Sequence, residues 1–74
     1  MSVTAIVPSD FGTRIGQLRE QRRWSQAHLA VEVGVTRDRV TCWENGRALP
    51  RLATVCLLAD LFETTTDYLL RGRS

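Results

Sequence analysis

The stretch that decides the fold runs from residue 26 to residue 46 and reads QAHLAVEVGVTRDRVTCWENG. Its apolar residues recur at helical spacing on both sides of Gly34, and glycine ends helices because it adopts a left-handed backbone at little cost. Thr36 can cap a new helix two residues later, and Asn45-Gly46 can end that helix in the same way as Gly34. The stretch therefore predicts two short helices joined by a sharp turn, and the second helix has a solvent-exposed, basic face.

Helical spacing of apolar residues continues outward in both directions, and no segment sustains the alternation that a strand would show. Four of the five expected helices begin after a residue whose side chain can accept a hydrogen bond from the first turn. The sequence therefore predicts an all-α fold, with residues 1–10 as an N-terminal arm, residues 11–70 as the domain and residues 71–74 as a C-terminal tail. The expected caps are Ser9 or Asp10, Ser25, Thr36, and Thr64 or Thr65.

Apolar residues at helical spacing form the predicted core. The first helix contributes one stripe and ends near Arg22, and Leu52 begins the inward stripe of the fourth helix. The last short helix contributes an apolar segment over residues 68–70. The inward residues are Phe11, Ile15, Leu18, Leu29, Ala30, Val33, Val40, Trp43, Leu52, Val55, Leu58, Ala59 and Phe62.

Size and composition narrow the classes of protein to consider. A chain of 74 residues with 43% apolar and 24% charged residues has room for one soluble domain. No apolar run approaches the roughly 18 residues that a membrane span needs, and no leader pattern appears, so we expect a cytoplasmic protein without membrane contact. Cys42 and Cys56 fall outside any Cys-x-x-Cys spacing, which argues against a metal site. With one histidine and no glycine-rich phosphate loop, we expect neither an enzyme nor a cofactor or small-molecule ligand.

Positive charge is concentrated in the first two thirds of the chain. Residues 11–51 contain eight arginines and four acidic residues, whereas residues 52–74 contain two arginines and three acidic residues. Every positive residue is arginine, which favours planar, bidentate contacts to phosphate or guanine. A compositional bias of the source genome explains the absence of lysine equally well.

The order and spacing of several motifs resemble the XRE family of helix-turn-helix domains, the type found in lambdoid phage repressors and Cro proteins. The resemblance covers about residues 11–70. It implies a five-helix, lambda-repressor-like fold with the helix-turn-helix at the second and third helices, and a protein that binds operator DNA as a dimer. The residues that carry the resemblance are Arg19, Gln26, Leu29-Ala30, Gly34-Val35-Thr36, Val40, Trp43-Glu44-Asn45-Gly46, Pro50, Leu58-Ala59 and Asp67-Tyr68-Leu69-Leu70.

Base contacts are expected from residues 37–45, which correspond to the recognition helix of the family. The helix period brings positions i, i+1, i+4 and i+5 to one face, opposite the buried side. Arg37 can donate two hydrogen bonds to guanine, and Asp38 can accept one from cytosine or instead orient Arg37 or cap the helix. Thr41 and Cys42 are small enough to contact a thymine methyl group. The candidate base readers are Arg37, Asp38, Thr41 and Cys42.

Phosphate contacts are expected from residues that border this face at helix ends and in the following loop. Gln26 resembles the family's glutamine, which hydrogen-bonds a phosphate and braces the start of the recognition helix. Arg39 lies at the side of the face, nearer to the DNA backbone than to the bases. Plain solvation is the alternative for each exposed side chain. The candidates are Ser25, Gln26, Thr36, Arg39, Asn45, Arg47 and Arg51.

Other predictions concern contacts within the chain and between copies of it. Arg19 and Glu44 match a family pair that forms a partly buried salt bridge between the first helix and the end of the recognition helix. Leu57 and Leu61 stand four residues apart at positions that are normally exposed, and they can form an apolar ridge for self-association. Two unrelated surface leucines are the alternative. The candidate dimer interface comprises Leu57, Leu61, Thr66 and Leu69.

The chain departs from the family pattern at two helix ends. Arg23 and Glu63 stand where the family usually has a glycine. A left-handed backbone at a residue with a Cβ atom costs about 1 kcal/mol, so we expect local strain at each position unless the helix ends differently.

These features predict a homodimeric, sequence-specific regulator of transcription, most simply a repressor, that binds double-stranded DNA. Two recognition helices related by a two-fold axis would read a palindromic operator. A phage regulator, a restriction-control protein and an antitoxin all fit the pattern. The competing hypothesis is a protein-interaction module, or the antitoxin of a toxin–antitoxin pair, whose main partner is a protein such as a toxin or RNA polymerase.

Overall fold

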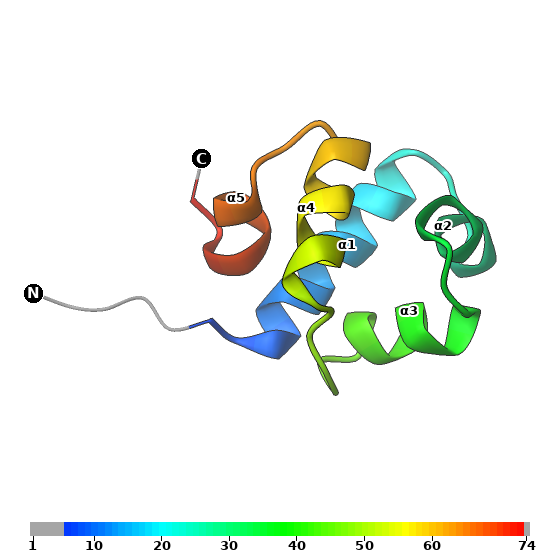
Figure 1. Cartoon of the computed structure of the whole chain (residues 1–74), viewed down its shortest axis with the longest axis horizontal. Coiled ribbons are helices and arrows are strands. Elements are labelled where there is room, and N and C mark those ends of the chain that lie inside the picture. Colours follow the sequence, from blue (N-terminus) through cyan, green and yellow to red (C-terminus); the bar gives the residue numbers. More distant parts are fainter. Residues whose placement is uncertain (1–5, 74) are drawn as a thin grey trace, which may run out of the picture.

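The structure is a computed structural model that describes residues 6–73. In this part of the chain, helices follow one another without a strand. In Figure 1, α2 and α3 lie on one side of α1, and α5 lies on the other. The predicted all-α, five-helix fold is confirmed. No helix in this part is both long and apolar enough to cross a membrane. The helices are α1 (Pro8–Gln21), α2 (Gln26–Val33), α3 (Arg37–Glu44), α4 (Leu52–Leu61) and α5 (Thr66–Arg71).

Helix α1 begins earlier than the sequence pattern predicts. Pro8 occupies its first turn, where a missing N–H leaves no hydrogen bond unmade, and Val7 precedes it with an extended backbone and no side-chain cap. The prediction that Ser9 or Asp10 caps this helix is therefore wrong, and the last three residues of the expected arm are helical. Asp10 instead places a negative charge in the first turn, at the positive end of the helix dipole. The first five residues of the expected arm lie outside the described residues.

The turn between α2 and α3 has the predicted caps and the predicted glycine. Ser25 Oγ accepts a hydrogen bond from the backbone N–H of His28 at 3.0 Å, and Thr36 Oγ1 accepts one from Arg39 at 3.3 Å. Gly34 has a φ of 79° and ends α2 with backbone hydrogen bonds to its last turn. Because so few residues separate the two helices, the chain bends sharply and α3 packs against α2.

A single core lies between the helices, and it matches the prediction at most positions. Leu18 and Val33 are half-buried and pack against it. The prediction for Leu52 is wrong, because this side chain is 71% exposed at the first residue of α4, where no neighbouring helix covers it. The buried apolar residues are Phe11, Ile15, Leu29, Ala30, Val40, Trp43, Val55, Leu58, Ala59, Phe62 and Leu69.

Two glycines inside α1, which the sequence-based predictions did not single out, let α3 approach the α1 backbone. A Cβ atom on Gly12 would lie 2.2 Å from the carbonyl oxygen of Trp43, and one on Gly16 would lie 3.3 Å from Glu44 Oε1. Any side chain at residue 12 would therefore overlap the backbone of α3. Glycine in a helix interior lowers helix stability by about 1 kcal/mol relative to alanine. A glycine found there despite this loss is the sequence signal for such a close contact.

The two helix ends without a glycine adopt the strained conformation that the sequence suggests. Arg23, after α1, has a φ of 59°, and Glu63, after α4, has a φ of 54°. Both lie in the left-handed region, which a Cβ atom disfavours. Beyond Glu63, Thr65 rather than Thr64 caps α5, since its Oγ1 accepts from the backbone N–H of Tyr68 at 3.0 Å.

Arg23→Gly is expected to stabilise the protein by about 1 kcal/mol, because glycine adopts the left-handed backbone without a steric clash. Arg23→Ala is the matched control. It removes the same charge but keeps the Cβ atom, and it should leave the free energy of unfolding nearly unchanged. Chemical denaturation followed by circular dichroism measures both variants. Equal stability of the two variants would contradict strain at this residue.

Candidate nucleic-acid interface

Helix α3 buries one side and exposes the other. Val40 and Trp43 are buried in the core, whereas Arg37 and Asp38 at its start are exposed. Among the described residues, neither the Arg37 nor the Asp38 side chain forms a hydrogen bond or an ion pair. The other two candidate base readers, Thr41 and Cys42, are half-buried. The first turn of α3 is thus the part of this helix that is open to a ligand.

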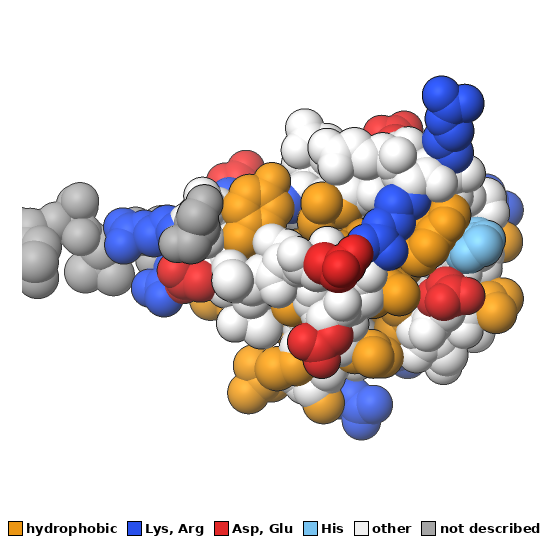
Figure 2. All heavy atoms as spheres, turned by 90° about the horizontal axis from the view of Figure 1, so that it is seen from above, with side chains coloured by type: hydrophobic (Ala, Val, Ile, Leu, Met, Phe, Trp, Pro, Cys, Tyr) orange, Lys and Arg blue, Asp and Glu red, His pale blue; other side chains and the backbone are white. Residues whose placement is uncertain are grey.

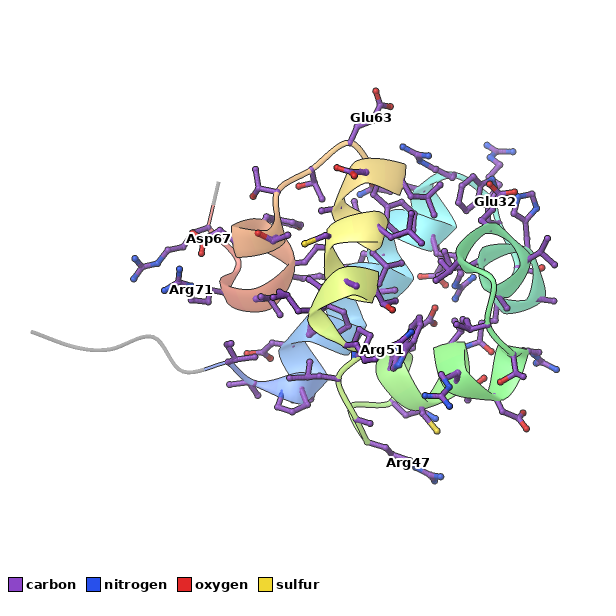
Figure 3. All side chains as sticks on the ribbon, in the orientation of Figure 1. Glu32, Arg47, Arg51, Glu63, Asp67 and Arg71 are labelled. Atoms are coloured by element: carbon purple, nitrogen blue, oxygen red, sulfur yellow. The ribbon has the colours of Figure 1, made fainter. Side chains whose placement is uncertain are left out.

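Arginine side chains border α3 on the same side of the molecule. Arg39 on α3 and Arg47 in the α3–α4 loop are exposed, and Figure 3 shows Arg47 projecting beyond α3, while Glu63 projects from the opposite side. In Figure 2, which looks onto the side away from α3, acidic, basic and apolar side chains are mixed. On and beside α3, four arginines are exposed: Arg37, Arg39, Arg47 and Arg51.

A hollow of about 520 Å³ lies between α3 and the start of α4. Arg39 and Arg51 line it together with the hydroxyl-bearing Thr36 and Thr54. The first backbone N–H groups of α4 have no partner within the helix, and Arg51, which precedes it with an extended backbone, provides no side-chain cap. Guanidinium groups and helix N-terminal amides together suit a phosphate oxygen.

The predicted salt bridge between α1 and the end of α3 is present. Arg19 Nε lies 2.7 Å from Glu44 Oε2, and Arg19 Nη2 lies 3.0 Å from Glu44 Oε1. The two side chains are only 13% and 9% exposed. The hydrogen bond to Glu44 raises the pKa of Arg19 above its ordinary value against the opposing effect of burial. Arg19 also donates to the carbonyl oxygen of Trp24 at 2.7 Å, so it fixes the chain between α1 and α2 as well.

Gln26 contacts a different part of α3 from the one that the family resemblance implies. Its Nε2 donates to Glu44 Oε1 at 3.1 Å, and its Oε1 accepts from Thr41 Oγ1 at 3.0 Å. The expectation that it braces the start of the recognition helix is therefore wrong. Gln26 instead holds the middle and the end of α3 through Thr41 and Glu44.

The four candidate dimer residues do not form one exposed ridge. Leu57 is 44% exposed, but Leu61 is half-buried against the core and Thr66 is half-buried. Leu69 is fully buried, so its assignment to an intermolecular surface is wrong. It is part of the core because α5 turns its apolar side toward α1 and α4. The exposed apolar face of α4 is instead made of Leu52, Ala53, Cys56 and Leu57.

Sequence reasoning missed part of the surface beside α3. Leu49, Pro50 and Thr54 line the hollow between α3 and α4, and of these only Pro50 belongs to the family pattern. The signal that could have found them is their closeness in sequence to Arg47 and Arg51. Within residues 6–73, no three His, Cys, Asp or Glu side chains lie close enough together to hold a metal ion.

Two helices joined at a left-handed glycine, the second lying on an arginine-rich side, define a helix-turn-helix domain. The family model described as a helix-turn-helix domain matches residues 10–71, and the chain belongs to this family. The XRE-type resemblance is confirmed by its solved relatives. The P22 c2 repressor in complex with a synthetic operator superposes with a TM-score of 0.81 at 30% identity, covering 85% of this chain and 96% of that one.

The curated relatives are transcription regulators. The regulator AnsR of Bacillus subtilis is 37% identical over 57 residues, which are 77% of this chain and 49% of that protein. The prophage-derived regulator YonR of the same organism is 36% identical over 62 residues, or 84% and 57% of the two chains. This chain thus spans about half the length of the curated relatives it matches. Hydroxypropylphosphonic acid epoxidase from S. wedmorenis also matches, with a TM-score of 0.78 at 26% identity, over 92% of this chain but only 36% of the enzyme.

Arg19→Met is expected to lower the free energy of unfolding by roughly 3 kcal/mol, because it leaves the Glu44 carboxylate buried without its charged partner. Arg71→Met is the matched control. It breaks the exposed Arg71–Asp67 ion pair within α5, which should contribute less than about 0.5 kcal/mol. Urea denaturation compares the two variants with the wild type. Equal losses in both would contradict a structural role for the Arg19–Glu44 pair.

Proposed function

We propose that this chain is a DNA-binding transcription regulator whose α3 enters the major groove of an operator. The observation that carries the proposal is the open first turn of α3 on an arginine-rich side of the molecule. The likeness to a repressor that was solved in complex with a synthetic operator supports DNA as the partner and favours repression as the mode of regulation. The proposal involves no chemical reaction.

Base reading rests first on Arg37 and Asp38. Both side chains are exposed and make no hydrogen bond or ion pair within the described part of the chain, so DNA is free to set their conformations. Arg37 would donate to guanine O6 and N7, and Asp38 would accept from a cytosine amino group. Cys42, which is half-buried one turn further along, would contact a thymine methyl group.

Phosphate contacts would come from residues on both sides of α3. The hollow lined by Arg39 and Arg51 lies beside the unpaired amides of α4, where a phosphate oxygen would be bound. Gln26 and Ser25 at the start of α2 would contact the DNA backbone on the other side. The proposed phosphate contacts are Ser25, Gln26, Thr36, Arg39, Asn45, Arg47 and Arg51.

A second copy of the chain completes the proposed function. One α3 reads only a few base pairs, whereas two copies related by a two-fold axis place two such helices about 34 Å apart and read a palindrome. The exposed apolar face of α4, defined above, is the proposed contact between the copies. Leu57 lies on it, and its 44% exposure leaves apolar surface that pairing would remove from water.

Arg37→Ala is expected to remove preference for the operator while leaving nonspecific binding, because its base contact is worth about 1–3 kcal/mol of discrimination. The operator is first selected from a random DNA pool with the wild-type protein. Gel shifts over a range of salt concentrations then compare the operator with an unrelated duplex. Arg73→Ala, which changes the same residue type in the chain's last residues, is the control.

Wild-type binding should weaken steeply as salt rises, since each neutralised phosphate releases condensed counterions. If the wild type selects no sequence from the pool and binds no duplex at low salt, the proposed function is wrong and a protein partner becomes the better hypothesis. If Arg37→Ala keeps the operator preference, Arg37 is not a base reader.

Leu57→Glu is expected to shift the protein toward the monomer, because it would bury unpaired charges at the two-fold contact. Val31→Glu is the matched control, since Val31 is 78% exposed on α2, away from the proposed contact. Sedimentation velocity of the DNA-free proteins measures the change. A dimer that survives Leu57→Glu would exclude this face of α4 as the pairing surface.

A further inference from the structure

A chain of hydrogen bonds runs from α1 through α3 to the first residue of α2. Arg19 donates to both carboxylate oxygens of Glu44, at 2.7 and 3.0 Å. Glu44 Oε1 also accepts from Gln26 Nε2 at 3.1 Å, and Gln26 Oε1 accepts from Thr41 Oγ1 at 3.0 Å. One connected set of side chains thus joins α1 to both helices of the helix-turn-helix.

The chemistry of the side chains in this chain of hydrogen bonds dictates the direction of each bond. A carboxylate that pairs with arginine can only accept, so Glu44 must face the amide nitrogen of Gln26 and not its oxygen. Gln26 Oε1 is then left facing Thr41, whose hydroxyl has to donate. This hydroxyl also lies 3.1 Å from the carbonyl oxygen of Arg37, so its single proton is shared between two acceptors within the protein.

We propose that Thr41 is a positioning residue for the phosphate contact of Gln26 and not a reader of bases. The side-chain nitrogen of Gln26 carries two protons. It donates one to Glu44, and no residue between 6 and 73 accepts the other. Held at both ends, Gln26 presents this N–H to the DNA. The opposite orientation would present Oε1, which a phosphate oxygen repels. The inference rests on the proposed function, because DNA is the ligand in both.

The two roles for Thr41 predict different effects on binding. A phosphate contact carries no sequence information, so its loss weakens binding to every duplex alike. A methyl contact to thymine, which the sequence also allows, affects preference at one base pair and leaves other DNA unchanged. The hydroxyl and the methyl group of threonine can be removed one at a time, which separates the two roles.

Thr41→Val keeps the methyl group and replaces the hydroxyl by a second methyl group, whereas Thr41→Ser keeps the hydroxyl and removes the methyl group. Thr41→Val is expected to raise Kd about tenfold for the selected operator and for an unrelated duplex, with base preference unchanged. Thr41→Ser should keep the wild-type Kd and base preference. Thr13→Val is the matched control, because the Thr13 hydroxyl bonds only to the carbonyl oxygen of Ser9, at 2.9 Å. Thermal unfolding verifies that all variants are folded.

A wild-type Kd in Thr41→Val would overturn the inference. So would a loss of preference at one base pair in Thr41→Ser, which would make Thr41 a thymine reader. A tenfold loss in Thr13→Val as well would also count against it, because the effect would then not be specific to Thr41. Failure of the wild type to bind any duplex would instead overturn the proposed function, and the inference with it.

Discussion

The carboxylate of Glu44 is the contact on which the placement of α3 depends. It is the last residue of that helix, and it holds Arg19 of α1 and Gln26 of α2 at the same time. Replacing a buried ion pair by apolar residues is often neutral for stability, so the value of this pair lies in its geometry. Because hydrogen bonding raises the pKa of Arg19, the charge that holds Glu44 is lost only as pH rises through that raised value. The orientation of α3 is therefore insensitive to Arg19 titration near neutral pH.

The glycines of α1 make this contact possible. Gly12 lets the backbone of α3 rest directly on α1, and Gly16 leaves room for the Glu44 carboxylate. Close approach also removes water, which strengthens the electrostatic attraction between Arg19 and Glu44. Packing and ion pairing therefore meet at the same place, the end of α3.

Local signals predicted the parts of the fold that depend on a few neighbouring residues. The caps at Ser25 and Thr36 and the left-handed Gly34 were all predictable, since each depends on backbone groups within one helical turn. The exposure of Leu52 was not predictable, and the sequence left Leu69 open between core and interface, because periodicity marks an apolar residue without saying which helix covers it. The hydrogen bond from Thr41 to Gln26 spans fifteen positions in the sequence, and only the turn between α2 and α3 brings the two side chains together.

The isolation of Arg37 and Asp38 from the rest of the described protein has an evolutionary consequence. Side chains that support no other part of the fold can change without loss of stability, since exposed substitutions of this kind usually alter it by less than about 0.5 kcal/mol. The residues that orient α3 and those at its exposed start are different sets. A lineage carrying this domain could therefore acquire new target sequences by drift at its first two positions, while the scaffold that presents them stays the same.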